Sequence, residues 1–244
     1  MTTVRLDIEY DGAGFKGWAR QAGLRTVQSE LEAALATVLR EPIGLTVAGR
    51  TDTGVHARGQ VASFETAVEL PDDLKWRLNG LTANDLTVTA AARADDGFDA
   101  RGDALSRTYR YRVLTRDASS PFEQGRAFWW PHRLDRDALD ACAAALLGIH
   151  DFTAFTPTQT DHVHFDRKIL SAAWESDGDI LSFNVTADAF MRNMVRILVG
   201  TQLEVANGKR TQESFKRLLQ GARRPDAGET APPHGLYLES VAYD

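Results

Sequence analysis

The sequence of 244 residues contains 43% hydrophobic and 25% charged side chains, the balance of a globular protein rather than a disordered or fibrous one. No stretch approaches the roughly 18 consecutive apolar residues that a membrane span requires, and the opening MTTVRLDIEY lacks the apolar core of a signal peptide. The single cysteine, Cys142, excludes an internal disulfide and a two-cysteine zinc site. We therefore predict a cytoplasmic protein without membrane association.

Acidic residues outnumber basic ones by 34 to 28, which gives a formal net charge of −6. This balance argues against a protein that coats nucleic acid over its whole surface, but it allows a local basic patch. Most of the basic residues are arginine, the side chain best suited to forked contacts with phosphate or carboxylate. Genome base composition produces the same bias, so the arginine content alone does not define a function.

The first half of the chain predicts a mixture of strands and helices. Apolar and polar residues alternate from Val4 to Tyr10, as in a strand with one buried face. Thr26 is a suitable cap for a helix whose apolar residues recur at steps of three and four as far as Leu39. Further strands are predicted at 43–48, 60–66 and 86–94, with a helix at about 72–79.

The second half repeats this order of elements. The segment 95–103, rich in Asp, Gly and Ala, predicts a boundary between domains at 1–103 and 104–244. Beyond it we expect strands at 105–115, 168–175, 180–187 and 236–242 and helices at 135–147, 190–204 and 211–220. This order predicts an α+β protein with two similarly built halves.

The glycines of GAGFKG follow the first predicted strand with the spacing of a dinucleotide-binding loop. In that fold a helix begins at the third glycine, whereas here the sequence from Trp18 to Gly23 intervenes before the cap. The next strand also ends in Gly49 and Arg50 rather than in an acidic residue. We therefore predict a tight loop and no cofactor, with a phosphorylated nicotinamide cofactor as the alternative.

A metal site has weak support in this sequence. His162 and His164, flanked by Asp161 and Asp166, have a spacing that suits a metal, but a polar loop explains them equally well. We predict no bound metal. The sequence also contains no GxSxG, HExxH or phosphate-loop pattern, so hydrolase and nucleoside triphosphatase activities have no local support.

The most informative segment is AGRTDTGVHARGQVASFET, residues 48–66. Arg50 and Asp52 follow a predicted strand and lie among glycines, where the backbone is able to turn sharply and approach a ligand. An aspartate in this place is able to act as a nucleophile that a neighbouring arginine keeps ionised. A structural ion pair in a glycine loop is the alternative that these residues leave open.

This segment resembles the nucleophile motif of the tRNA pseudouridine synthase A family, usually GRTDAGVHA followed by GQV. Other stretches resemble the family in the same order along nearly the whole chain: IEYDGAGFKGWARQ, VQSELEAALATVL, FDARGDALSRTYRYRV, LLGIHDFTAF, AFMRNMVRILVG and GLYLESVAY. The chain departs from the family pattern at Ala19, where glutamine is common, at Thr53, where alanine is usual, and in the unfamiliar segment 159–167. These departures concern local substrate contacts rather than the chemistry.

The resemblance implies an isomerase that breaks the bond between N1 and C1′ of uridine, rotates the uracil and joins C5 to C1′ without a cofactor. It assigns Asp52 as the nucleophile, which attacks either the ribose or the base, and Arg196 as the basic residue that keeps Asp52 ionised. Arg192 lies one turn earlier on the same side of the expected helix, so spacing alone does not separate the two arginines. The motif position favours Arg196.

Further roles follow from the resemblance. Arg50 is expected to hold the target nucleotide out of its stem, and Tyr109 to contact the uracil. A core stripe formed by Tyr109 with Tyr111 and Val113 is the alternative for the tyrosine. Strand alternation places Arg110 and Arg112 on the opposite face. These two form the densest basic run in the chain together with Arg107 and Arg116. The run of Arg107, Arg110, Arg112 and Arg116 is a candidate contact to the tRNA backbone.

The resemblance also implies the architecture and the partners. We expect one continuous, mixed and mostly antiparallel sheet with the active site in a central cleft, Asp52 coming from the first domain and Tyr109 and Arg196 from the second. A homodimer is expected to bind the anticodon stem-loop of tRNA and to modify uridines at positions 38, 39 and 40. A noncatalytic tRNA-binding chaperone on the same fold is the alternative, and the presence of these three side chains argues against it.

Overall fold

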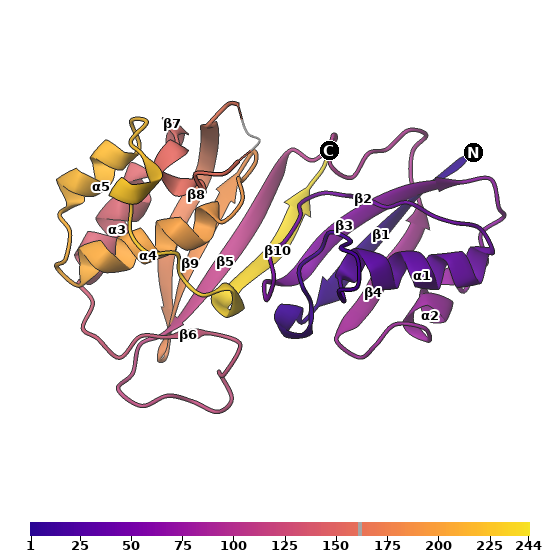
Figure 1. Ribbon diagram of the computed structural model, residues 1–244, viewed down its shortest axis with the longest axis horizontal. Coiled ribbons are helices and arrows are strands. Elements are labelled where there is room, and N and C mark those ends of the chain that lie inside the picture. The colour runs from indigo at the N-terminus through magenta and orange to yellow at the C-terminus, as the bar shows by residue number, and fades with distance from the viewer. Residues whose placement is uncertain (161–162) are drawn as a thin grey trace. The chain divides into compact units, whose positions relative to one another are not determined.

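The computed structural model describes residues 1–160 and 163–244 (Figure 1). The chain divides into two compact units: unit 1 comprises Met1–Leu105 and Tyr237–Asp244, and unit 2 comprises Ser106–Leu236. The sequence pattern assigns 104–244 to a single domain, whereas the last strand of the structure lies with unit 1. Unit 2 is therefore an insertion between two strands of unit 1.

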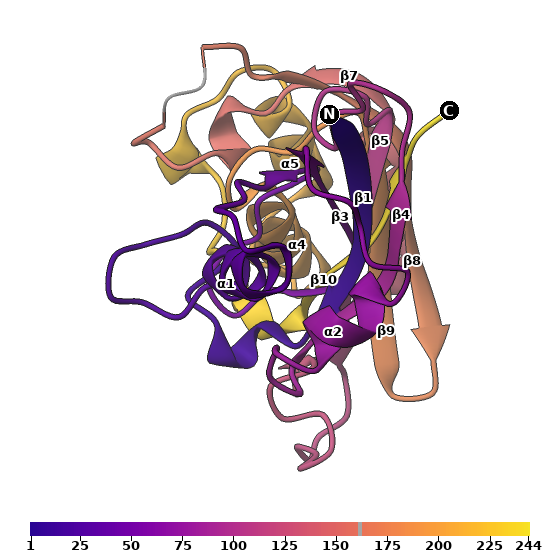
Figure 2. The ribbon, with the colours of Figure 1, turned by 90° about the vertical axis from the view of Figure 1, so that its right-hand side faces the viewer.

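Unit 1 is a twisted sheet with helices on one face (Figure 2). Its strands are in the order β4-β1-β3-β10, with β2 as a further partner of β3. β1 is antiparallel to β3 and β4, and β10 is parallel to β3. The elements are β1 (Thr2–Tyr10), a 3-10 turn (Gly12–Gly14), α1 (Val27–Leu39), β2 (Thr46–Val47), β3 (His56–Thr66), α2 (Leu74–Asn79), β4 (Leu86–Arg93) and β10 (Leu236–Ala242).

Local chemistry explains the first elements of unit 1. Leu6 and Ile8 of β1 are fully buried, while Arg5 and Asp7 alternate with them and form an ion pair of 2.7 Å. The side chain of Thr26 accepts a hydrogen bond from the backbone of Ser29, which completes a capping box at the start of α1. The predicted strand and the predicted helix cap are confirmed.

Unit 2 has strands in the order β5-β9-β8-β7, all antiparallel to their neighbours, and a short β6 parallel to β5. Helices α3, α4 and α5 lie on one face of this sheet, and the chain between β5 and β6 extends away from them (Figure 1). The helices are α3 (Arg136–Ala145), α4 (Met194–Ala206) and α5 (Gln212–Leu218), and the strands are β5 (Ser106–Leu114), β6 (Phe128–Trp129), β7 (Gly148–Asp151), β8 (Asp166–Asp177) and β9 (Ile180–Ala187). Further 3-10 turns occupy Thr153–Phe155, Arg224–Asp226 and Pro233–Gly235.

Three details correct the expected elements. The helix expected from residue 190 begins at Met194, because Asn193 has a left-handed backbone with φ of 61° that interrupts the helix. The strand expected at 43–48 is reduced to the two residues of β2. The strands β6 and β7 have no counterpart among the expected elements.

The α+β class with a mixed, mostly antiparallel arrangement of strands is confirmed. In residues 1–160 and 163–244, no helix combines the length and the apolar character needed to cross a membrane. The expected active-site cleft stays a prediction.

Candidate active site

Asp52 lies in the loop that joins β2 to β3. Its carbonyl accepts a hydrogen bond of 3.1 Å from the backbone N–H of Val55, which closes a tight turn, and Gly54 within the turn has a φ of 78°. The carboxylate belongs to a half-buried residue, while Arg50 in the same loop is exposed. The structure therefore places Arg50 and Asp52 in one loop of unit 1.

A buried polar network holds this loop in place. The hydroxyl of Tyr10 and Oγ1 of Thr51 lie 2.7 Å apart and share a hydrogen bond. Gln60, which is fully buried, donates to the carbonyl of Gly49 at 2.7 Å and to the hydroxyl of Tyr10 at 3.3 Å. The backbone is thus held on both sides of Arg50, directly before Asp52.

Burial raises the pKa of Tyr10 to about 12, and its hydrogen bonds with Thr51 and Gln60 offset part of this effect. The phenol therefore keeps its proton at neutral pH. Gln60 donates to the phenol oxygen, and in the hydrogen bond between Tyr10 and Thr51 either hydroxyl is able to donate. The network is neutral and holds the loop without adding a charge beside Asp52.

The glycine loop after β1 supports the Asp52 loop through close backbone contacts. A Cβ atom on Gly12 would lie 2.0 Å from the carbonyl oxygen of Val55, and one on Gly17 would lie 2.8 Å from that of Thr51. The backbone N–H of Trp18 also donates to the Thr51 carbonyl at 3.0 Å. The expected tight loop is confirmed, and two of its glycines have a packing role at this site.

β10 supports the other side of the Asp52 loop within unit 1. It pairs with the start of β3, and the ring of Tyr237 stacks on that of His56 with centroids 4.6 Å apart. His56 is buried, and its Nδ1 accepts the backbone N–H of Gly12 at 3.1 Å. The imidazole thus connects the glycine loop, β3 and β10.

In unit 2, the alternation along β5 separates two tyrosines with different surroundings. Tyr111 is fully buried and donates its hydroxyl to the carbonyl of Pro232 at 2.7 Å, and burial raises its pKa well above the usual value. Tyr109 is 7% exposed and meets the ring of Phe190 edge-on at a centroid distance of 5.0 Å. Tyr111 belongs to the core. Tyr109 lies at the end of the same row of buried side chains, next to the loop that precedes α4.

The structure separates the two arginines that spacing alone left equivalent. Arg196 lies in the first turn of α4, is half-buried, and donates from Nε to the carbonyl of Ala231 at 2.8 Å. A terminal nitrogen of the same guanidinium donates to Oδ1 of Asn193 at 2.8 Å. Arg192 precedes the helix, is exposed, and donates to the carbonyl of Gln159 at 2.6 Å.

The arginines of the basic run occupy different environments. Arg107 is 9% exposed, shares the Tyr109 face of β5, and donates to the carbonyl of Asp188 at 2.8 Å. Arg110 and Arg112 lie on the opposite face, where they contact Asn184 at 3.1 Å and Glu123 at 2.8 Å, respectively.

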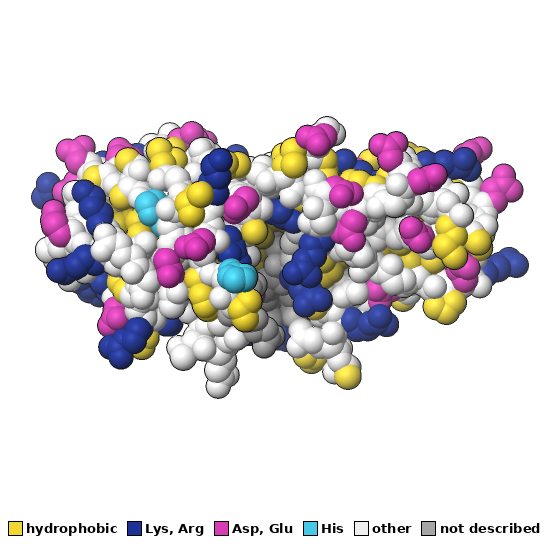
Figure 3. Space-filling view, turned by 90° about the horizontal axis from the view of Figure 1, so that it is seen from above, with side chains coloured by type: hydrophobic (Ala, Val, Ile, Leu, Met, Phe, Trp, Pro, Cys, Tyr) yellow, Lys and Arg dark blue, Asp and Glu magenta, His cyan; other side chains and the backbone are white. Residues whose placement is uncertain are grey.

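Arg116 follows β5 and is exposed, at 3.4 Å from Asp179. On the face of the molecule in Figure 3, Lys and Arg side chains alternate with Asp and Glu. No single-sign field covers that face.

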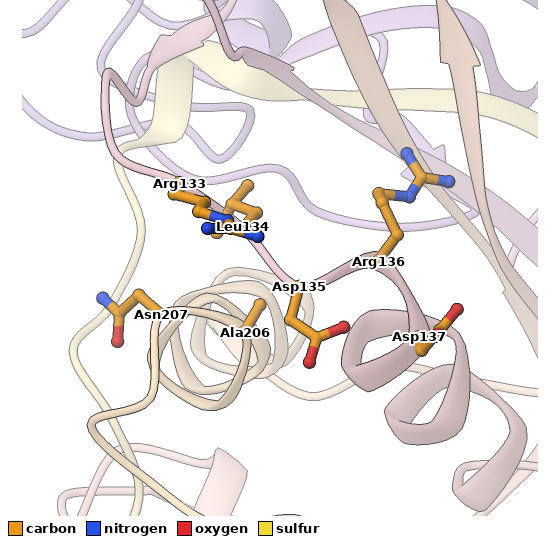
Figure 4. A pocket seen from close by; sticks show the side chains of 7 residues that line it. All are labelled: Arg133, Leu134, Asp135, Arg136, Asp137, Ala206 and Asn207. Carbon is orange, nitrogen blue, oxygen red and sulfur yellow. The ribbon is translucent and has the colours of Figure 1, made fainter.

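Outside these loops, an open hollow of about 530 Å³ lies at the N-terminal end of α3 (Figure 4). None of the expected site residues lines it, and Asp135 there accepts the backbone N–H of Ala138 as the helix cap. The lining residues are Arg133, Leu134, Asp135, Arg136, Asp137, Ala206 and Asn207.

Residues 1–160 and 163–244 contain no cluster of three or more His, Cys, Asp or Glu side chains arranged to hold a metal. The alternative metal site includes Asp161 and His162, which lie outside the described residues.

Sequence reasoning missed four residues that hold the expected site residues in place. Tyr10 and Gln60 act on the Asp52 loop, Phe190 contacts Tyr109, and Asn193 contacts Arg196. Gln60 belongs to the GQ that follows the nucleophile motif, which was the available signal for it. For Asn193 the signal was an amide residue near a predicted helix start.

Comparisons with known proteins identify relatives of this chain. The family model described as "tRNA pseudouridine synthase" matches residues 142–244. A tRNA pseudouridine synthase A of Bacillus pumilus is 41% identical over 245 residues, covering 99% of each chain. One of Leifsonia xyli is 42% identical over 265 residues, covering 99% of this chain and 92% of the relative.

The chain has an α+β fold, and these relatives match it over 99% of its length. This combination defines a pseudouridine synthase. The chain belongs to the tRNA pseudouridine synthase A family.

Proposed function

We propose that Asp52 is the nucleophile with which this chain, a tRNA pseudouridine synthase, isomerises uridine in tRNA. The observation that carries the proposal is the bracing of the Asp52 loop: Tyr10 holds Thr51, and Gln60 holds Gly49. A carboxylate on a rigid, half-buried loop meets a substrate with little conformational cost. A binding protein has no comparable need to hold so firmly the backbone that carries one carboxylate.

The reaction conserves all atoms of the uridine. The bond between N1 and C1′ breaks, the uracil turns while it remains bound, and C5 bonds to C1′. The proton lost from C5 is balanced by one gained at N1, so neither a redox partner nor a cofactor is consumed. Asp52 forms a transient covalent bond with the ribose or with the base, and that bond breaks before the product leaves.

Arg196 is proposed to keep Asp52 ionised, since a guanidinium close to a carboxylate favours its charged form. Tyr109 is proposed to contact the uracil, because it is the tyrosine of β5 that lies beside the loop carrying Phe190. Arg50, exposed on the loop of Asp52, is proposed to occupy the space left by the flipped nucleotide.

The proposed substrates are uridines at positions 38, 39 and 40 in the anticodon stem-loop. Arg110, Arg112 and Arg116 are proposed contacts to the RNA backbone, because they lie on or beyond the open face of β5. Arg107 is proposed to act from the buried side by holding the Asp188 carbonyl and the loop that follows it. We further propose that the protein acts in the cytoplasm as a homodimer, as the family resemblance implies.

Release of tritium from tRNA labelled at uracil C5 tests this function. The wild-type protein should release tritium and form pseudouridine, whereas Asp52→Asn should fold and bind tRNA but lose activity by more than about a thousandfold, some 4 kcal/mol. Asp96→Asn is the matched control, because Asp96 is an exposed aspartate of unit 1 that is remote in sequence from the motif. Single-turnover measurements at saturating enzyme separate lost chemistry from weakened binding.

Two outcomes would contradict the proposal. Tight tRNA binding without tritium release by the wild-type protein would favour the noncatalytic chaperone. Failure of Asp52→Asn to fold would show that Asp52 serves a structural ion pair. Products must be checked for deamidation of the new asparagine, which would restore the aspartate.

A further inference from the structure

Asn193 occupies an unusual position at the start of α4. Its φ of 61° lies in the left-handed region, which only one other described residue besides glycine, Arg40, adopts. Asparagine adopts this region more readily than most residues with a Cβ atom, but the conformation still costs free energy, and such positions are concentrated at functional sites. The surrounding structure must therefore hold Asn193 in place.

The side chain of Asn193 also forgoes the usual role of an asparagine at a helix start. Asparagine is among the best N-cap residues, because its side-chain oxygen accepts a backbone N–H of the first turn. The carbonyl of Asn193 does receive the N–H of Ile197 at 3.0 Å, but its side chain makes no capping hydrogen bond. Its Oδ1 instead accepts from the guanidinium of Arg196 at 2.8 Å.

A second acceptor holds the same guanidinium from a distant segment. Nε of Arg196 donates to the carbonyl of Ala231 at 2.8 Å, and the N–H of Ala231 donates back to the Arg196 carbonyl at 3.1 Å. This segment lies tightly on α4, because a Cβ on Gly200 would come within 1.9 Å of the Glu229 carbonyl oxygen. The guanidinium of Arg196 is planar, and two of its nitrogen atoms donate to fixed acceptors. The direction of its remaining N–H groups is therefore determined.

These two acceptors are neutral, so they orient the guanidinium without placing a negative charge beside it. Nearby Tyr111 is neutral as well, since burial raises its pKa. Arg192, the adjacent cation, is exposed and donates to Gln159. An aspartate at 193 would make the same hydrogen bond but would neutralise the charge that the nucleophile needs.

We propose that Asn193 is a positioning residue that holds the guanidinium of Arg196 in the orientation that the reaction requires. The inference rests on the proposed function, because it takes Arg196 to act on the nucleophile. Asn193 gives up a helix cap and an unstrained backbone in order to make this contact.

Two substitutions separate the parts of this role. Asn193→Gly keeps the left-handed turn, which glycine adopts freely, and removes the acceptor. We expect the single-turnover rate to fall roughly 10- to 100-fold while the dissociation constant for tRNA changes less than about 2-fold. Asn193→Asp keeps both the turn and the acceptor, and we expect at least the same loss of rate because the new carboxylate pairs with Arg196.

A double-mutant cycle distinguishes positioning from a merely structural role. It compares the effect of Asn193→Gly on the single-turnover rate in two backgrounds, and a merely structural role would give the same effect in both. In an Arg196→Lys background, where the planar fork is absent, Asn193→Gly should lower the rate by no more than about 2-fold. Arg40→Gly is the matched control, because Arg40 has a φ of 59° at the end of α1. That variant should leave both rate and binding unchanged.

A wild-type rate for Asn193→Gly, or the same loss in both backgrounds, would overturn the inference. A parallel loss of thermal stability and tRNA binding by Asn193→Asp, with its rate at saturation intact, would assign Asn193 to folding alone. Full activity of Arg196→Gln would instead overturn the role of Arg196 in the proposed function. The two failures are therefore distinguishable.

Discussion

The hydroxyl of Tyr10 and Oγ1 of Thr51 share a buried hydrogen bond of 2.7 Å, which joins residues 41 positions apart in the sequence. Thr51 directly precedes Asp52, so the end of β1 helps to position the Asp52 loop. Gln60 completes the network from β3. The position of the Asp52 loop thus depends on polar groups in the core of unit 1, where an unpaired hydroxyl or amide is costly.

Tyr10→Phe should lower both stability and activity. Loss of the phenol oxygen leaves Thr51 and Gln60 with an unmet hydrogen-bonding group, and we expect a cost of about 1–3 kcal/mol in the free energy of unfolding. The single-turnover rate should fall as the loop loosens. Denaturant unfolding and tritium release measure the two effects, and an unchanged rate in a destabilised variant would restrict Tyr10 to a role in folding.

Stability should fall at high pH through Tyr10. Its pKa is about 12 in the folded protein and 10.0 in a free side chain, so between these values the folded state binds more protons than the unfolded state. The stabilisation is fully present below about pH 10 and is lost as the pH rises toward 12.

The denaturant midpoint should therefore decrease more steeply across this window in the wild type than in Tyr10→Phe. Equal pH dependence of the two proteins would contradict the assignment. Phenolate absorbance gives an independent check, because the sequence contains only five tyrosines and Tyr10 should ionise late among them.

Gly17→Ala should impair catalysis more than Gly23→Ala. Both glycines have positive φ values, 90° and 73°, so both substitutions carry backbone strain. Only the Cβ at Gly17 meets a neighbour, 2.8 Å from the carbonyl oxygen of Thr51, whereas nothing lies within 4 Å at Gly23. Comparison of unfolding free energies and single-turnover rates isolates the displacement of the Asp52 loop, and equal rates would show that the loop absorbs the clash.

Arg110→Ala and Arg112→Ala should weaken tRNA binding and flatten its dependence on salt. Each lost phosphate contact reduces the logarithmic slope by about one unit, with little change in the single-turnover rate at saturating enzyme.

Glu123→Gln should strengthen binding, since it frees Arg112 from its ion pair. Arg223→Ala removes an equally charged but 83% exposed side chain and serves as the control. An unchanged slope would assign these arginines to folding or to contacts between subunits.

Local patterns predicted those elements whose structure depends on local forces. The alternation through β1 and the capped periodicity of α1 are properties of short windows, and both elements occur where expected. The predicted start of α4 was wrong, because the apolar residues Phe190 and Met191 extend the helical pattern of the sequence toward the N-terminus. The left-handed backbone of Asn193 prevents the helix itself from extending that far. The two-residue β6 exists only through its pairing with β5, which no local pattern records.

The same distinction applies to the site. Asp52 and Arg196 were assigned through the family motifs that surround them, and their catalytic roles stay predictions. Tyr10 and Gln60 were missed because their hydrogen bond joins positions 50 residues apart. A buried polar contact of this kind becomes visible only when the strands are placed side by side.

The membership of β10 in unit 1 has a consequence for biosynthesis. A ribosome must make all of Ser106–Leu236 before it makes the strand that pairs with β3 and stacks Tyr237 on His56. The nascent unit 1 therefore waits with an unpaired strand edge beside the loop of Asp52 throughout the synthesis of unit 2. Folding of the Asp52 loop is thereby coupled to late translation, and a chain released before Tyr237 would lack the β10 pairing and the ring stack on His56 that support this loop.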